Sequence, residues 1–121
     1  MTYNDKYKPP MTLWETKTFM RQSEELLSHE EDSALKFSLG MDPESGDLIS
    51  NTGGARKLRW AIGAQGKRGG VRVVYCFGGD DMPLILFAVY KKGRKDDLTE
   101  KEKAELKSII KAIRGQYRKE H

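Results

Sequence analysis

The spacing of apolar side chains changes near residue 55, and it predicts a helical first half followed by strands. Residues 17–27 place apolar side chains at helical intervals, which indicates a first helix. Ser28 and Glu31 then form an S-x-x-E capping box, the mark of a second helix start. That helix must end at Asp42-Pro43, because proline disfavours helical geometry in the residue before it. We expect the two helices to form a short hairpin.

The second half alternates instead with the period of a strand. Residues 56–62 place Leu58, Trp60 and Ile62 on one face, with Lys57 and Arg59 on the other. Residues 71–77 predict another strand. Residues 84–90 are nearly all apolar, which is typical of a central strand buried on both faces. Residues 13–15 favour one more short strand.

A last helix is predicted after Thr99, which forms a second capping box with Glu102. Its apolar stripe consists of Leu106, Ile109, Ile110, Ile113 and Tyr117. Strands joined by short turns pair in an antiparallel manner. We therefore expect an α+β fold: an N-terminal helical hairpin and a C-terminal helix packed on one side of an antiparallel sheet of three to four strands. Residues 1–12 are predicted to be a flexible arm, and residues 13–121 a single domain.

Charge is distributed very unevenly along the chain. The net charge of +4 divides into −5 over residues 1–55, +8 over residues 56–95 and +1 over the remainder. A concentrated cationic segment attracts polyanions, although an ordinary solvated basic face would have the same composition. The single cysteine excludes an internal disulfide and fits a reducing cytoplasm. No apolar run approaches the roughly 20 residues that span a bilayer, so we expect a cytoplasmic protein without membrane contact.

Several kinds of chemistry find no support in the sequence. The two histidines, His29 and His121, and the lone Cys76 offer no zinc-ligand spacing, so we expect no metal and no cofactor. Cys76 is interpreted as a small core residue. The segment Ala61–Arg68 fails as a phosphate-binding loop, because a Walker motif needs glycine at its first position and serine or threonine at its last.

The cations of the predicted strands are the strongest chemical signal. Lys57 and Arg59 are two residues apart, so they lie on one sheet face about 7 Å apart. Arg72 opens the next strand, where it can sit diagonally to Arg59, and Lys91 and Lys92 follow the third strand. Gathered like charges destabilise a fold unless a polyanion binds them. A cationic face of this kind suits phosphate chemistry without metal.

Two segments also resemble a known family. The run from Thr52 to Ala61 reads T-G-G-A-R-K-L-R-W-A, and the run from Gly66 to Tyr75 reads G-K-R-G-G-V-R-V-V-Y. Together they resemble the RelE/HigB superfamily of type II toxin–antitoxin toxins, and are closest to its HigB-like branch. The ending Tyr90-Lys91-Lys92-Gly93 through Asp97-Leu98-Thr99, followed by a charged helix, fits the same branch. The resemblance covers roughly residues 13 to 115 and implies a RelE-like fold.

The resemblance implies a ribosome-dependent endoribonuclease that cuts messenger RNA in the A site of the 30S subunit. The 2′-hydroxyl of the RNA attacks the adjacent phosphorus, leaving a 2′,3′-cyclic phosphate and a 5′-hydroxyl. Carried over to this chain, the catalytic residues are Lys57, Arg59, Arg72 and Lys92. Further RNA-binding residues are expected at Arg56, Lys67, Arg68, Tyr90, Lys91 and Arg94.

Physical chemistry distributes the roles among these side chains. Arginine stays protonated, so Arg59 and Arg72 serve as planar clamps on the phosphate and not as bases. The neighbouring arginines favour the neutral form of Lys57, which makes it the candidate general base. Lys92 is the candidate acid for the leaving oxygen, or a phosphate ligand. The active-site tyrosine of RelE has no counterpart, because Leu98 stands at the aligned place; Tyr90 and Tyr117 are the possible substitutes.

Two other functions remain open at this point. A ParE-like toxin would share the fold but poison DNA gyrase without cutting RNA, and a non-catalytic module would bind RNA or the ribosome. The cation set favours the nuclease over the gyrase poison. For a toxin of this kind, the resemblance implies a cognate antitoxin, in this branch usually a helix-turn-helix, HigA-like protein.

Overall fold

The protein is described by a computed structural model covering residues 12–63, 70–93 and 97–120. The first helices are α1 (Lys17–Leu26) and α2 (His29–Met41), and the last is α3 (Glu100–Glu120). The strands are β1 (Leu13–Glu15), β2 (Asp47–Leu48), β3 (Ala55–Trp60), β4 (Val71–Cys76) and β5 (Leu84–Lys91). The expected arm at residues 1–12 lies outside this description except for Thr12.

The α+β class is confirmed, but the sheet differs from the expected one. Over the residues that the structure describes, it is mixed and five-stranded, in the order β1-β5-β4-β3-β2. β1 pairs with β5 in parallel, with Leu13 opposite Leu84, whereas the other pairs are antiparallel. The expectation of a purely antiparallel sheet is therefore wrong. β1 is joined to the sheet through the helical hairpin, so the short-turn argument does not apply to it.

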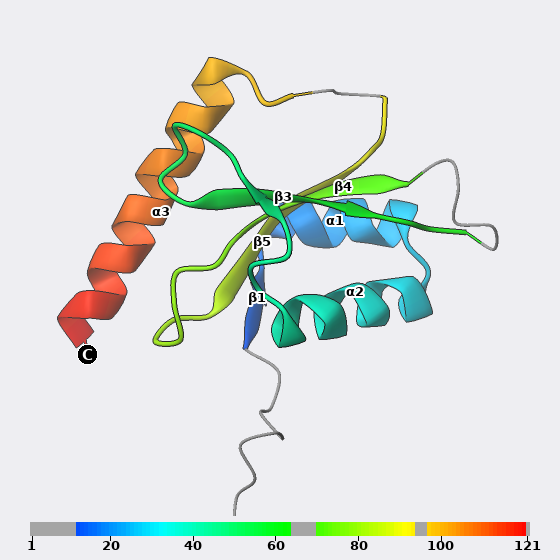
Figure 1. Ribbon diagram of the computed structural model, residues 1–121, viewed down its shortest axis with the longest axis horizontal. Helices are drawn as coiled ribbons and strands as arrows, with labels where there is room; N and C mark the ends of the chain where they lie inside the picture. The colour runs from blue at the N-terminus through cyan, green and yellow to red at the C-terminus, as the bar shows by residue number, and fades with distance from the viewer. Residues whose placement is uncertain (1–11, 64–69, 94–96, 121) are drawn as a thin grey trace, which may run out of the picture.

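Helices cover both faces of the sheet, contrary to the expectation that they share one side. Figure 1 shows α3 on one side of the edge-on sheet, with α1 and α2 on the other. Val71, Val73 and Tyr75 of β4 pack with the hairpin, in a cluster that includes Phe19 and Leu35. The alternate β4 residues Val74 and Cys76 pack in a second cluster with Ile110 of α3. The central strands are apolar on both faces because each face has its own core.

The helix starts follow the sequence closely. The side chain of Ser28 accepts a hydrogen bond from the backbone N–H of Glu31, and the Glu31 carboxylate accepts one from the backbone N–H of Ser28. Thr99 and Glu102 exchange the same pair of bonds at the start of α3. Both predicted capping boxes are confirmed, because each depends only on residues three positions apart.

The apolar stripes are only partly buried. Leu35 and Leu39 of α2 are fully buried, whereas Phe37 and Met41 are 62% and 50% exposed. Ile109 of α3 is also exposed, unlike the rest of its predicted stripe. Each helix covers one face of a small sheet, so only the side chains that point directly at the strands are enclosed.

Candidate nucleic-acid interface

Three side chains form a straight row across the central strands. Arg59 of β3 is directly opposite Arg72 of β4, and Arg72 is directly opposite Tyr90 of β5. Directly paired residues share a sheet face, with Cβ atoms about 5 Å apart. The diagonal placement of Arg72 expected from the sequence is therefore wrong, because the two arginines form a direct pair. We call Arg59, Arg72 and Tyr90 the cation row.

The cation row lies on the face that carries α3, at the margin of the α3 core: Tyr90 packs against that core, whereas Arg59 does not belong to it. Arg72 alternates with Val74 and Cys76, which belong to the α3 core. Figure 1 shows α3 toward the end of the sheet where β5 begins, while β3 and β4 extend away from it. Arg59 is exposed, and Arg72 and Tyr90 are half-buried. Arg59 is therefore the member of the row most open to a ligand, and Tyr90 is the one nearest to the α3 core.

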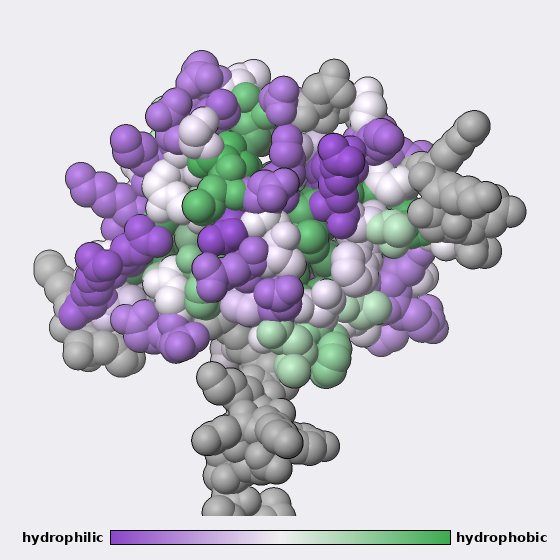
Figure 2. Space-filling model, viewed as in Figure 1, coloured by the Kyte–Doolittle hydropathy of each residue, from purple (hydrophilic) through white to green (hydrophobic). Residues whose placement is uncertain are grey.

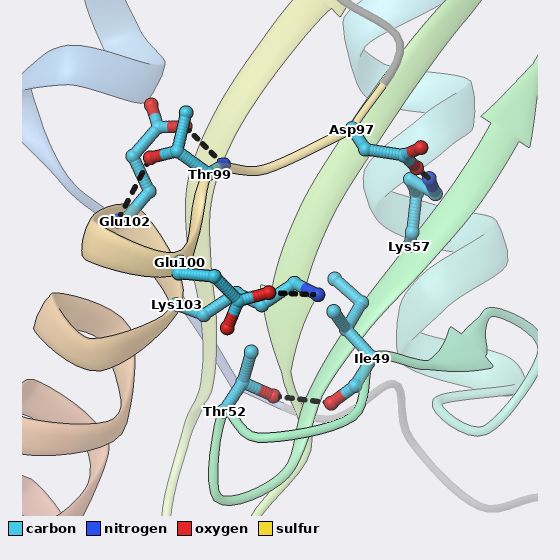
Figure 3. A network of polar contacts seen from close by, with 8 residues as sticks. All are labelled: Ile49, Thr52, Lys57, Asp97, Thr99, Glu100, Glu102 and Lys103. Atoms are coloured by element: carbon cyan, nitrogen blue, oxygen red, sulfur yellow. Dashed lines mark hydrogen bonds and ion pairs between the residues drawn. The ribbon is translucent and has the colours of Figure 1, made fainter.

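Lys57 extends this surface toward the middle of the sheet. It lies two residues before Arg59 on the same face, opposite Val74. Its Nζ lies 3.1 Å from Oδ1 of Asp97, which follows β5 in the chain, as Figure 3 shows. The Lys57 side chain is 29% exposed and that of Asp97 is 81% exposed. The candidate base therefore has a carboxylate as its partner in this structure.

Asp97 is the functional candidate that sequence reasoning missed. It lies one residue before Leu98, which packs in the α3 core, and two before the helix cap Thr99. Leu98 and Thr99 fix the position of the chain at the start of α3. The Asp97 carboxylate next to them thereby lies against Lys57, 40 positions away in sequence. The only signal in the sequence was the acidic pair Asp96-Asp97 in a basic segment. We call Lys57, Asp97 and the cation row the candidate site.

The loop before β3 accounts for part of the T-G-G-x-R-K motif. Buried Thr52 donates a hydrogen bond from Oγ1 to the Ile49 carbonyl, 2.6 Å away (Figure 3), and accepts one from the backbone N–H of Ala55. The two glycines that follow have φ angles of +73° and +122°, which favour glycine. Arg114 of α3 donates to the carbonyl of the first glycine, Gly53. The threonine and glycines therefore shape the entry into β3 and contact α3.

Some expected RNA-binding residues lie elsewhere. Arg56 belongs to the opposite face, where its guanidinium donates to the carbonyls of Glu44 and Gly46, at 3.1 and 2.7 Å. Its side chain is only 15% exposed. Lys91 is paired with Val71 and so lies on the hairpin face. Neither residue joins the candidate site.

Lys92 stays near the site. Its backbone N–H donates to the carbonyl of Gly70, which places it one position beyond Lys91, at the end of the sheet that carries the cation row. Its side chain is exposed. Lys67, Arg68 and Arg94 lie outside the described residues.

The two candidate tyrosines are separated by the fold. Tyr90 belongs to the cation row, whereas Tyr117 lies near the end of α3 against Trp14 of β1, with ring centroids 5.6 Å apart. Because β1 pairs with the start of β5 and Tyr90 is near its end, Tyr117 is far from the arginines. Of the two tyrosines, Tyr90 is the one beside Arg72.

Cys76 is fully buried in the α3 core, as its interpretation as a core residue requires. Burial raises the pKa of its thiol, so the thiolate is disfavoured at neutral pH. Within the described residues no three side chains of His, Cys, Asp or Glu gather in a way that would hold a metal ion. The candidate site itself is made of one lysine, two arginines, one tyrosine and one carboxylate.

A scan of the sequence against models of known protein families finds no match. Over the described parts of the chain, no helix is long and apolar enough to cross a membrane. The geometry of the candidate site and the resemblance of its motifs are the grounds for the proposal that follows.

Proposed function

We propose that the chain is the toxin of a type II toxin–antitoxin system, a RelE/HigB-like endoribonuclease that cuts messenger RNA on the ribosome without a metal ion. The observation that carries the proposal is the cation row: two arginines paired directly across β3 and β4, with a tyrosine beside them and Lys57 on the same face. Such a surface matches a single-stranded RNA backbone with one adjacent base.

Arg59 and Arg72 hold the scissile phosphate in this proposal. Each guanidinium remains charged and presents paired N–H donors that match two phosphate oxygens. As the 2′-hydroxyl attacks, negative charge accumulates on the nonbridging oxygens of the phosphorane. Fixed cations stabilise that charge more than the charge of the ground state, which lowers the barrier.

Lys57 is the proposed general base. It takes the proton of the 2′-hydroxyl only in its neutral form, and in the absence of RNA its Nζ contacts the carboxylate of Asp97. The Asp97 side chain is 81% exposed, and ion pairs at the surface are weak, so a bound RNA strand can displace this carboxylate. Lys92, at the same end of the sheet, would protonate the departing 5′ oxygen, so that cleavage leaves a 5′-hydroxyl.

Tyr90 is proposed to stack on the base next to the scissile phosphate. Its place beside Arg72 suits this role, because an aromatic ring next to a phosphate clamp supports one nucleotide through base and backbone together. The partners that accompany the proposal are messenger RNA, the 30S A site and a helix-turn-helix, HigA-like antitoxin, all in the cytoplasm.

The proposal is tested by inducing the protein in bacterial cells and mapping the 5′ ends of cellular RNA. We expect new 5′-hydroxyl ends within translated messages for the wild type. Arg72→Ala should remove them, while Lys111→Ala, which deletes an exposed cation on α3, should keep them. DNA damage without new RNA ends would instead indicate a gyrase poison. Growth arrest with neither new RNA ends nor DNA damage would indicate a non-catalytic ribosome binder. Either of these two results would overturn the proposed nuclease.

A further inference from the structure

A cleft of about 950 Å³ opens at the end of the sheet opposite the cation row. Four parts of the chain meet there: β1, the end of α2, the connection between β4 and β5, and the last turns of α3. In Figure 1 they lie together toward the lower left, whereas β3 ends at the right. The lining residues that bear on its chemistry are Trp14, Met41, Glu44, Asp80, Asp81 and Tyr117.

The cleft is acidic in a protein that is basic overall. Glu44, Asp80 and Asp81 line it, and the described residues of its wall include no Lys or Arg. The Glu44 carboxylate forms an ion pair with Arg56, in which Oε2 and Nη2 lie 3.4 Å apart. Asp80 and Asp81 are exposed at the mouth. The surface therefore attracts cations and repels the phosphates that the cation row would bind.

The walls between these carboxylates are apolar and aromatic. Trp14 is 47% exposed and Met41 50% exposed, although both are large apolar side chains. Tyr117 packs against Trp14 at a tilt of 58° and extends the aromatic wall. An indole face that remains open next to carboxylates is suited to an aliphatic or aromatic side chain and to a cation placed over the ring.

We propose that this cleft is a docking site for a protein partner that inserts a cationic peptide segment with an aromatic or aliphatic anchor. Charge complementarity selects a segment rich in lysine or arginine, which pairs with Asp80 and Asp81. The apolar wall selects a large side chain among those cations, which packs against Trp14. The volume falls within the range of sites that enclose a ligand, so it admits an anchor and its neighbours.

The position of the cleft gives the interaction a defined consequence. Six residues of β4 separate the two ends of the sheet, a span of about 17 Å. A short segment bound in the cleft therefore leaves the cation row open. The inference is independent of the proposed nuclease, because it rests on the other end of the molecule.

The probe is an array of hexapeptides in which Lys or Arg alternates with Trp, Leu or Phe, tested against the full-length protein. Binders are then measured by fluorescence anisotropy. We expect binding to weaken at least tenfold when the apolar residues of the peptide become Ala. The double variant Asp80→Asn with Asp81→Asn should weaken peptide binding at least fivefold. Trp14→Ala should also weaken peptide binding at least fivefold. The matched control, Glu24→Gln with Glu25→Gln on exposed positions of α1, should change affinity less than twofold.

Several results would overturn the inference. They are the absence of any binder in the array, equal weakening by the Glu24 and Glu25 control, or binding that ignores the apolar residues of the peptide. A tenfold gain in affinity on removal of residues 2–11 would make the chain's own first residues the occupant. Loss of concentration-dependent self-association in the Asp80 and Asp81 variant would make the occupant a second copy.

Discussion

Tyr75 shows how one side chain joins separate parts of the chain. It is fully buried in β4, yet its hydroxyl donates to the Pro43 carbonyl and accepts from the Gly46 N–H, both at 2.8 Å. Burial raises the pKa of this hydroxyl, which keeps it neutral and able to donate. The bonds fix the connection after α2 onto the sheet.

We expect Tyr75→Phe to lower the free energy of unfolding by about 1–2 kcal/mol, because it leaves a backbone donor and acceptor without their partner. Urea unfolding followed by circular dichroism measures the change. Ser108→Ala, which removes a hydroxyl at an exposed position of α3, is the comparison variant. A Tyr75→Phe protein as stable as the wild type would show that water replaces both bonds.

Glu31 links the start of α2 to the end of β3. Its carboxylate accepts hydrogen bonds from the backbone N–H groups of Ser28 and Gly63, at 2.8 and 2.6 Å. These bonds, that of Ser28 first, lower the pKa of Glu31 from its ordinary 4.5. A carboxyl with a lowered pKa in the folded state contributes stability above its unfolded pKa, and that contribution is lost as the pH falls through the folded value.

Glu31→Ala should therefore lower the Tm at pH 7, and its difference from the wild type should shrink as the pH falls below 4.5. Thermal unfolding across that pH range is the measurement. Glu30→Ala, at the exposed neighbouring position, serves as the control. A difference in Tm that stays constant with pH would show that the ionised carboxylate contributes nothing.

Among the elements, α3 depends on the loop that precedes β3. Gly54 has a φ of +122°, and a Cβ there would lie 3.3 Å from Nη2 of Arg114. Gly54→Ala should destabilise the protein by about 1–3 kcal/mol through backbone strain. Gly115→Ala on α3 meets nothing within 4 Å and should stabilise it by about 0.5–1 kcal/mol. Chemical denaturation measures the change in the free energy of unfolding for each variant. Equal changes for Gly54→Ala and Gly115→Ala would show that the positive φ of Gly54 causes no strain.

The elements themselves were predictable where the information is local. Both capping boxes, the hairpin of helices and strands β3 to β5 follow from neighbouring residues. The parallel pairing of β1 was not predictable, because it depends on how the hairpin returns the chain to β5. The placement of α3 on the second face was missed as well, although the apolar run in β5 already required cover on both sides.

The candidate site was predictable to a similar extent. Alternation alone put Lys57 and Arg59 on one face, and the strand turn brought Arg72 to them. Arg56, expected among the RNA-binding residues, lies on the opposite face, as the same alternation requires. Asp97 could not be found in this way, since its contact with Lys57 depends on the path of a loop.

At the scale of the whole molecule, charge is separated along the sheet. The cation row lies at one end and the acidic cleft at the other. A single-stranded RNA should therefore bind in one orientation relative to the sheet, with its phosphates at the basic end.

This separation predicts a specific salt dependence for RNA binding. Arg59→Ala should weaken binding of a short single-stranded RNA and reduce the steepness of log K against log salt by about 0.7, the loss of one phosphate contact. Lys111→Ala on exposed α3 should leave that slope unchanged. Titrations at several salt concentrations provide the slopes. Equal slopes for both variants would mean that RNA does not select the cation row.

The most direct measurement is cleavage of a defined message on purified ribosomes by folded variants. The wild type should cut within the A-site codon and leave a 5′-hydroxyl. Lys57→Ala and Arg72→Ala should each slow cleavage by about 100-fold or more, as expected for loss of a proton-transfer group or a charge stabiliser. Lys111→Ala should stay within about twofold of the wild type. Wild-type rates for Lys57→Ala and Arg72→Ala, or no cleavage by the wild type, would contradict the account.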